Sequence, residues 1–185
     1  MDSLQNQLLV AMPSLDDPFF GRTVTYICEH NDEGAMGIVL NHPIDLSVSE
    51  LLTQLDIAHD GQSLNAKQAV VAGGPVQPDR GFILHSPKAG YSSSISLNDE
   101  LMLTTSRDIL EDLASSKAPE KFLLALGYAG WSAGQLEQEI ADNSWLVLPA
   151  SSLVIFDLAH DEKWQGAALH NGISLWQLSN TAGHA

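Results

Sequence analysis

The stretch Phe122-Leu-Leu-Ala-Leu-Gly-Tyr-Ala-Gly-Trp-Ser-Ala-Gly-Gln-Leu-Glu-Gln-Glu139 joins an apolar run to a helical pattern through a glycine-rich turn. Phe122 to Leu126 has the length and the apolar character of a buried strand. The turn contains Gly130-Trp131-Ser132-Ala133-Gly134, which fits the G-x-S-x-G pattern of the nucleophile elbow in α/β-hydrolases. A strand, a turn and a helix in this order allow two interpretations of Ser132, as a nucleophile or as a helix cap.

The rest of the chain favours the cap. An α/β-hydrolase needs an acid and then a histidine after its nucleophile, on later strands of a large parallel sheet. Only 53 residues follow Ser132, and they contain one convincing strand, Trp145 to Leu148. In the alternative, the Ser132 side chain caps the helix and Gln135 reaches back to the Ser132 N–H, as in a capping box. We expect no catalytic residue, and a serine hydrolase using Ser132 is the alternative.

The composition bounds the class of protein and its partners. The chain has 185 residues, which suits one domain over 1–185, and 44% of them are hydrophobic. Its 8 basic and 23 acidic residues give a formal charge of −15, which repels nucleic acid and anionic lipid. The sequence shows no transmembrane run and no signal peptide, and Cys28 is the only cysteine. By elimination we expect a cytoplasmic monomer or homodimer, without a direct nucleic-acid or membrane partner.

The order of the predicted elements indicates an α+β fold. Val24 to His30 and Ala35 to Leu40 are apolar, β-branched runs joined by a polar turn, which predicts a hairpin. A capping box at Ser47 to Glu50 predicts a short helix. We expect a mobile loop at Pro87–Ser94 and a frayed tail at Ser179–Ala185. Because strands and helices do not alternate regularly, the pattern does not predict a doubly wound sheet. The other predicted elements are strands at Leu8–Met12, Val70–Val71, Gly81–His85 and Leu101–Thr104, a helix after Thr105–Asp108, and helices at Leu153–Phe156 and Trp164–Leu169.

Three polar or glycine-rich segments lie at predicted strand ends: Gly73-Gly74-Pro75, Thr105-Ser106-Arg107-Asp108 and Gly130–Gln135. Ligand sites favour helix starts and glycine backbones next to rigid strands. We predict that at least two segments share one wall of a concavity, with Arg107 as its charged anchor and Trp131 as its apolar one. The alternative is that each segment only caps its own helix or turn. The predicted ligand-binding residues are Gly74, Ser106, Arg107, Trp131 and Gln135.

The pattern of metal-ligating residues is weak. The seven histidines are scattered along the chain, and no two of them have the spacing of a helical ligand pair. Cys28 and His30 share one face of a predicted strand, but two ligands do not make a site. We therefore predict no metal site and no cofactor.

Many segments, in fixed order, resemble the YqgE/AlgH family of bacterial proteins. They are Leu9–Pro13, Arg22–Val24, Tyr26–His30, Gly34–Gly37, Gly73–Val76, Arg80–Phe82, Thr105–Asp108, Gly127–Ala129, Trp131 and Gly134–Glu137. The resemblance runs almost from end to end. It implies a single α+β domain in which a mixed, strongly curved, barrel-like sheet is surrounded by helices.

The same resemblance implies little chemistry, because it brings no catalytic, cofactor-binding or ligand-binding residue with it. Some members of the family are named as transcriptional regulators. For a chain with a charge of −15 and no basic helix, that name would mean an indirect role through a protein partner. We therefore predict a non-enzymatic binding or regulatory module that acts on a protein partner or a small ligand.

Overall fold

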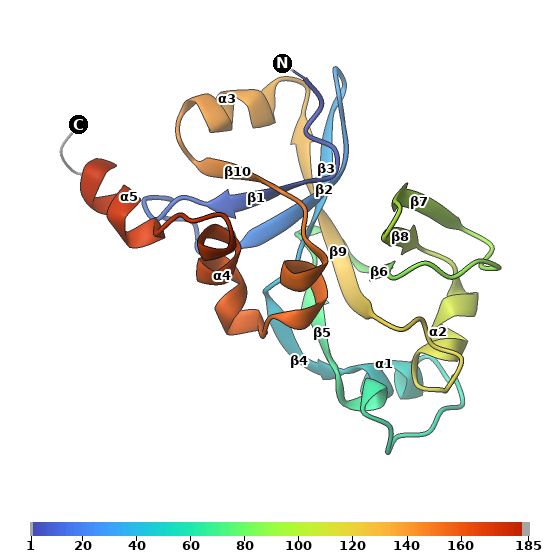
Figure 1. Cartoon of the computed structure of the whole chain (residues 1–185). Helices are drawn as coiled ribbons and strands as arrows, with labels where there is room; N and C mark the ends of the chain where they lie inside the picture. Colours follow the sequence, from blue (N-terminus) through green and yellow to red (C-terminus); the bar gives the residue numbers. More distant parts are fainter. Residues whose placement is uncertain (1, 183–185) are drawn as a thin grey trace.

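One strongly curved sheet of ten strands organises the chain, and helices lie around it (Figure 1). The computed structural model describes residues 2–182, with side chains up to residue 178. The strands are β1 (Gln7–Ala11), β2 (Val24–Asn31), β3 (Gly34–Val39), β4 (Pro43–Ser47), β5 (Ala69–Ala72), β6 (Val76–His85), β7 (Ser94–Asn98), β8 (Leu101–Thr104), β9 (Phe122–Ser132) and β10 (Trp145–Pro149). The helices are α1 (Val48–Gln54), α2 (Arg107–Leu113), α3 (Gln135–Ala141), α4 (Lys163–His170) and α5 (Leu175–Ala182), with short 3₁₀-helices at η1 (Asn65–Lys67) and η3 (His160–Glu162) and a π-helix at η2 (Leu153–Asp157). The predicted α+β class with a curved sheet is confirmed.

The central strand of the sheet is β9. The strands follow the order β10-β1-β2-β3-β9-β6-β8-β7, and β5 also pairs with β9 while carrying β4 on its other edge. The pairing of β5 with β9 is parallel, and the other pairs are antiparallel, so the sheet is mixed. In Figure 1, β9 runs between the β1–β2–β3–β10 layer and the β6–β7–β8 layer.

The partners of β9 change along its length. On one edge it pairs with β6 from Phe122 to Tyr128, and there the pairing stops. On the other edge it pairs first with β5 at Ala125 and Leu126, and then with β3 from Ala129 to Ser132. One strand of 11 residues therefore joins two half-sheets.

The first half of β9 lies in the core. Leu123 and Ala125 belong to a buried cluster with residues of η2 and α4, whereas Leu124 belongs to a second cluster with residues of α1 and α2. Alternating side chains of a strand point to opposite faces, so this part of the sheet is covered on both sides. A third cluster, under α3, contains Trp131 and Trp145.

Several predicted boundaries were wrong, and β9 is the most instructive. Its predicted end at Leu126 precedes a glycine, but pairing with β3 carries the strand on to Ser132. Strand β6 begins at Val76 and not at Gly81, because a bulge between these two residues returns the chain to its register with β9. Tertiary pairing overrides the local turn signals at both places.

The other differences concern short elements. The sequence patterns missed β4 and β7, and α5 occupies part of the tail predicted to fray. Residues 183–185 of that tail lie outside the described residues. The predicted hairpin is confirmed as β2–β3, and the capping box at Ser47 and Glu50 is present with both of its hydrogen bonds. No helix within residues 2–182 combines the length and the apolar character needed to cross a bilayer.

Candidate functional site

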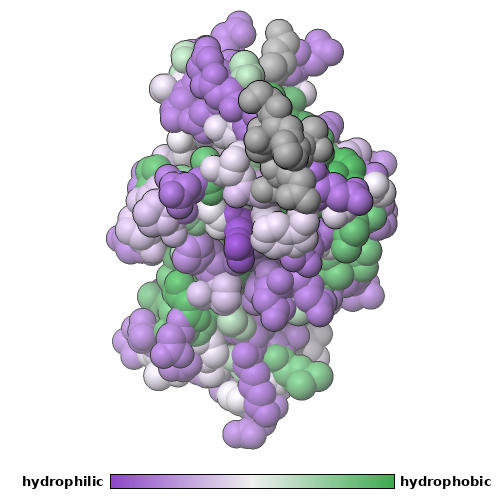
Figure 2. Space-filling view, turned by 90° about the vertical axis from the view of Figure 1, so that its left-hand side faces the viewer, coloured by the Kyte–Doolittle hydropathy of each residue, from purple (hydrophilic) through white to green (hydrophobic). Residues whose placement is uncertain are grey.

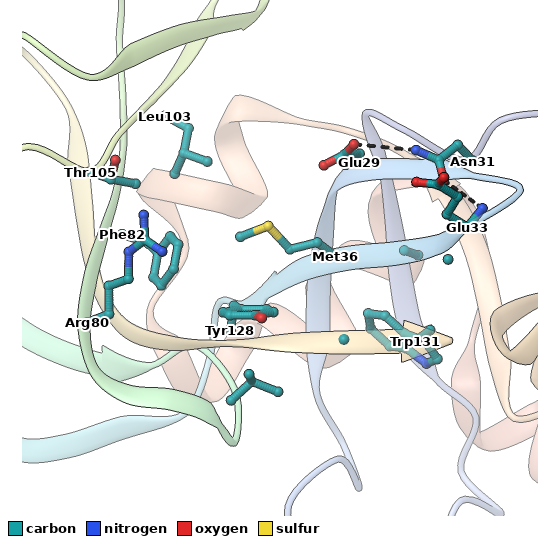
Figure 3. A pocket seen from close by; sticks show the side chains of 14 residues that line it. Glu29, Asn31, Glu33, Met36, Arg80, Phe82, Leu103, Thr105, Tyr128 and Trp131 are labelled. Carbon is teal, nitrogen blue, oxygen red and sulfur yellow. Dashed lines mark hydrogen bonds between the residues drawn. The ribbon is translucent and has the colours of Figure 1, made fainter. Parts of the chain in front are cut away.

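A cleft of about 680 Å³ opens where the two half-sheets diverge (Figure 3). One wall is the β2–β3 hairpin, which contributes Glu29, Glu33 and Met36. The opposite wall consists of β6 and β8, and β9 lies between them as the floor. The volume is within the range of about 300–1,000 Å³ that is typical of ligand sites. The complete lining is Glu29, Asn31, Glu33, Gly34, Ala35, Met36, Val76, Arg80, Phe82, Leu103, Thr105, Tyr128, Gly130 and Trp131.

Aromatic and apolar side chains form the interior of the cleft. Tyr128 stands on the floor and packs edge-on against Phe82, with ring centroids 5.5 Å apart. Met36 and Leu103 face this pair from opposite walls (Figure 3). Trp131 lies at the far end of the floor, but its side chain is buried in the cluster under α3, where its indole N–H donates to Glu139 at 3.1 Å. Such a surface offers contact area at a low cost in conformational entropy.

The charged groups of the cleft lie at its rim and have opposite signs on the two walls. Glu29 and Glu33 are exposed on the hairpin, where Asn31 donates to Glu29 at 3.4 Å and accepts from the Glu33 N–H at 2.8 Å. Arg80 stands on the other wall, 5.2 Å above the Phe82 ring. In the described part of the chain it forms no ion pair, and it donates only to Gln77, at 3.4 Å. A ligand in this cleft would therefore have carboxylates on one side and a guanidinium group on the other.

The floor of the cleft also has an open backbone edge. Pairing with β6 ends at Tyr128, whereas pairing with β3 continues to Ser132. Residues 129–132 of β9 consequently have no strand partner, among the described strands, on the edge that faces away from β3. Apart from the Ser132 N–H, which donates to Gln135, this edge can accept a further extended segment.

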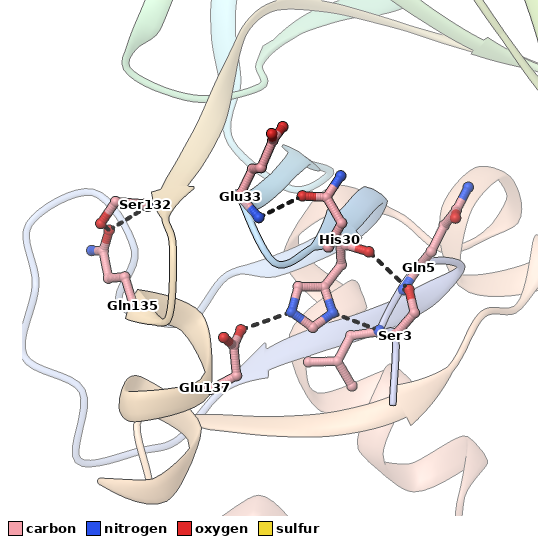
Figure 4. A network of polar contacts seen from close by, with 9 residues as sticks. Ser3, Gln5, His30, Glu33, Ser132, Gln135 and Glu137 are labelled. Atoms are coloured by element: carbon pink, nitrogen blue, oxygen red, sulfur yellow. Dashed lines mark hydrogen bonds and ion pairs between the residues drawn. The ribbon is translucent and has the colours of Figure 1, made fainter. Parts of the chain in front are cut away.

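Ser132 lies next to this cleft, and its environment differs from both predictions. It remains in β9, paired with Gly34, so α3 begins later with Gly134 as its N-cap at φ +77°. The predicted capping box is therefore wrong, although Gln135 does accept the Ser132 N–H at 2.9 Å. The exposed Ser132 hydroxyl donates to the same Gln135 oxygen at 3.2 Å, and no described histidine forms a hydrogen bond with it. Figure 4 shows this pair beside the His30 network.

His30 is a structural link that the sequence patterns missed. Its Nδ1 accepts the Leu4 N–H at 2.8 Å, so the other nitrogen, Nε2, carries the proton and donates to Glu137 at 2.7 Å. The buried ring thus ties the N-terminal segment to β2 and α3 (Figure 4). With both nitrogens occupied, His30 is neither a free base nor a metal ligand. Burial raises the pKa of its neighbour Cys28 to about 12, so this thiol packs as an apolar group.

A serine, a threonine and a histidine do meet elsewhere, at the start of β7. Nδ1 of His85 donates to the Ser86 carbonyl at 2.8 Å, so Nε2 accepts the Thr104 hydroxyl at 2.6 Å. Thr104 in turn accepts the Ser94 hydroxyl at 2.8 Å. Burial lowers the pKa of His85, which keeps the ring neutral. Because His85 and Thr104 are fully buried, this chain of hydrogen bonds fastens β7 to β8 and β6.

The family model described as AlgH-like matches residues 8–176. The chain belongs to the AlgH-like family. Curated relatives include UPF0301 proteins of Pseudoalteromonas translucida, at 53% identity over 185 residues, and of Shewanella loihica, at 54% over 187 residues, each match covering 100% of both chains.

Solved structures agree with the AlgH-like fold. The solution structure of the AlgH protein from Pseudomonas aeruginosa is similar with a TM-score of 0.79 and 45% identity, over 99% of this chain and 96% of that one. A crystal structure of a Corynebacterium diphtheriae protein gives a TM-score of 0.73 at 22% identity, over 92% of this chain and 87% of that one, which is a likeness of fold alone.

In this AlgH-like chain, two of the three predicted segments contribute to the cleft, one through Thr105 and one through Gly130 and Trp131, but the five predicted ligand-binding residues do not all lie there. Trp131 lines the cleft, whereas Gly74, Ser106, Arg107 and Gln135 are not among its lining residues. Arg107 donates to the Leu55 carbonyl at 2.8 Å and so joins α2 to the end of α1.

The other three predicted residues have structural partners. The Ser106 hydroxyl donates to Asp108, which lowers the pKa of that carboxyl, and Gln135 binds Ser132 and Glu139. Gly74 packs directly on the β9 backbone at Tyr128. In the cleft, Arg80 is the charged residue and Tyr128 the aromatic residue that take the places of the predicted anchors, and the site prediction included neither. They are 48 residues apart in the sequence, and only the pairing of β6 with β9 brings them together, so no local pattern could have identified them.

Proposed function

We propose that this AlgH-like chain is a non-catalytic binding module that holds an extended protein segment in the cleft across β9. The open edge of β9 at residues 129–132 is the observation that carries this proposal. An added strand gains affinity from main-chain hydrogen bonds and specificity from pockets for alternate side chains. Beside that edge, the aromatic floor at Tyr128 can take an apolar side chain, and the charged groups of the rim can take charged ones.

The rim charges favour a segment of particular chemistry. A basic side chain would lie against Glu29 and Glu33, and an acidic one would reach Arg80 on the opposite wall. An apolar side chain between them would pack on Tyr128, Met36 and Phe82. Since the whole chain has a charge of −15, long-range attraction favours a partner that is basic overall.

The same charge shapes the proposed biological role. We propose a cytoplasmic module, monomeric or homodimeric, whose regulatory effects pass through a protein partner and not through direct contact with nucleic acid. Duplex DNA repels a chain with 8 basic and 23 acidic residues, so a sub-micromolar, salt-sensitive complex with DNA would contradict this role.

The test is a selection of random peptides displayed on phage against the full chain, followed by NMR titration of the selected peptides. We expect shifts at the amides of Gly130 and Trp131, and a loss of affinity of about tenfold in Glu33→Gln when the peptide is basic. Arg107→Gln is the matched control, because Arg107 is exposed but not part of the cleft. Peptides that bind without disturbing residues 129–132 would refute strand addition.

A parallel thermal-shift screen with small metabolites distinguishes the other kind of ligand. A compound that stabilises the wild type and the Arg107→Gln variant, but not Arg80→Gln, would make the cleft a small-molecule site. A compound that depends on Arg107 and not on Arg80 would support the site predicted from the sequence instead.

A further inference from the structure

A second site is built around Arg22, on the side of the molecule that carries α4 and α5. Figure 2 faces this side, where hydrophilic residues predominate and hydrophobic ones gather in separate patches. The backbone of Arg22 has φ +59°, a left-handed conformation that is rare for a residue with a side chain. Asn41 holds it there, because its amide donates to the Arg22 carbonyl at 2.9 Å and accepts the Val24 N–H at 2.8 Å.

Two tryptophans fix the guanidinium of Arg22. Its central carbon lies 5.7 Å from the ring centre of Trp164 and 5.4 Å from that of Trp176, and these two rings are nearly perpendicular. Trp164 is itself fixed, because its indole N–H donates to the Ala11 carbonyl at 2.8 Å. A cation held over aromatic faces loses little further entropy when it binds an anion.

Although Arg22 is held in place, its N–H donors are not used. Within the described part of the chain, its guanidinium forms neither an ion pair nor a hydrogen bond. An arginine presents five donors in a fork that matches the oxygens of a carboxylate or a phosphate. The side chain is therefore positioned for an acceptor that the described residues do not supply.

A pocket of about 400 Å³ adjoins Arg22 and contains a second group without a partner. His160 lines it, and Nδ1 of His160 is buried without a hydrogen bond from any described residue. A neutral imidazole accepts at one of its two nitrogens, and Nδ1, which has no partner, can be that nitrogen. Burial and the Lys163 charge hold the pKa of His160 below its ordinary value, so the ring is neutral at pH 7. A buried acceptor left without a donor is costly, and a bound molecule could relieve that cost.

We propose that this pocket binds a small oxyanion-bearing molecule, whose oxygens accept from Arg22 and whose hydroxyl or N–H donates to His160. A phosphate monoanion or a hydroxy acid has both features. The lining adds polar side chains from His42 and Gln165. This site is independent of the cleft, because the two share no lining residue.

One carboxylate opposes such a ligand. Asp161 is exposed among the lining residues, and the negative charge of the chain repels anions at long range. Binding must therefore come from short-range hydrogen bonds, and we expect millimolar affinity for inorganic phosphate alone. Larger ligands gain from contacts with the rest of the pocket.

The experiment is an NMR titration of the full chain with sodium phosphate, in parallel with sodium lactate, at constant ionic strength and pH. We expect saturable shifts of the Arg22 side-chain N–H and of the indole N–H groups of Trp164 and Trp176. The Arg22→Gln variant should lose these shifts, while Arg80→Gln, which removes the other arginine stacked on a ring, should keep them. A response to phosphate alone or to lactate alone would identify the oxyanion.

Two results would overturn the proposal. One is the absence of saturation with both anions, or shifts of equal size in both arginine variants, which would mean general salt effects. The other concerns His160. Replacing it by Phe keeps an apolar ring in the pocket and removes the acceptor, so affinity should fall about tenfold. Unchanged affinity in a folded His160→Phe variant would contradict the proposed site.

Discussion

The two halves of β9 lie in opposite environments within one strand. From Phe122 to Leu126 nearly every side chain is buried, since η2 and α4 cover one face and α1 and α2 cover the other. From Tyr128 to Ser132 buried and accessible positions alternate, one edge has no strand partner, and the floor of the cleft begins. The first half stabilises the fold, and the second half supplies the surface on which we place the binding function.

The change takes place at Gly127. Its φ of +79° bends the strand, and an added Cβ would lie 2.4 Å from the Gly74 carbonyl oxygen. Gly74 in turn packs on the Tyr128 backbone, where its own Cβ would lie 2.0 Å from the carbonyl carbon. The bend therefore needs two residues without side chains, and it is the reason that one strand can leave the core and enter a cleft.

Gly127→Ala should have the largest effect, because it combines a disfavoured φ with a clash against backbone. We expect a loss of at least about 4 kcal/mol in the free energy of unfolding, measured by urea denaturation. Gly172→Ala is the matched control, since Gly172 has a similar φ of +74° with no atom within 4 Å of the added Cβ. That control should lose about 1 kcal/mol. Equal losses would mean that the crossing with Gly74 does not constrain the strand.

Leu124→Ala tests the first, buried half of β9, the closed half, in contrast to the open half from Tyr128 to Ser132. Leu124 is fully buried against residues of α1 and α2, so its truncation should lower the free energy of unfolding by about 3 kcal/mol. Tyr128→Leu is the counterpart in the open half and should cost about 1 kcal/mol, because the side chain is half-buried and stays apolar. The affinity for a bound peptide should fall more in Tyr128→Leu than in Leu124→Ala. If Tyr128→Leu destabilised the protein as much as Leu124→Ala, the proposed division of β9 would be incorrect.

Lys163 lies in α4, which covers the closed half of β9, and it makes the free energy of unfolding depend on pH. It is buried, its ammonium donates to the Ile155 carbonyl of η2 at 2.6 Å, and burial lowers its pKa to about 8. Between pH 8 and 10 the unfolded chain still binds this proton while the folded chain releases it, so stability rises with pH. Relative to Lys163→Met, the wild type should gain about 2 kcal/mol over that range. Lys121→Met, which removes an exposed partner of Asp157, should leave the rise in place.

The sequence predicted the closed half of β9 better than the open half. A run of apolar residues is enough to identify Phe122–Leu126 as a buried strand. The continuation to Ser132 depends on pairing with β3, about 95 residues earlier in the chain, and Gly127 and Gly130 give local signals for a turn. Two of the three predicted segments do share the cleft, since Thr105, Gly130 and Trp131 line it, but Arg107, the predicted charged anchor, donates to the Leu55 carbonyl instead.

The smallest effect is expected at Ser132, where the open half ends. Its hydroxyl donates to Gln135, but the Ser132 N–H donates to the same oxygen and remains in Ser132→Ala. The exposed variant should therefore lose about 0.5 kcal/mol or less, and Gln135→Ala, which removes the acceptor of both bonds, should lose about 1 kcal/mol. An active-site-directed fluorophosphonate, with labelling followed by mass spectrometry, tests the hydrolase alternative on the same pair of variants. We expect no label on Ser132, because its hydroxyl faces an amide oxygen and not a general base. Stoichiometric labelling that disappears in Ser132→Ala would show that the open end of β9 is an active site and not a binding surface.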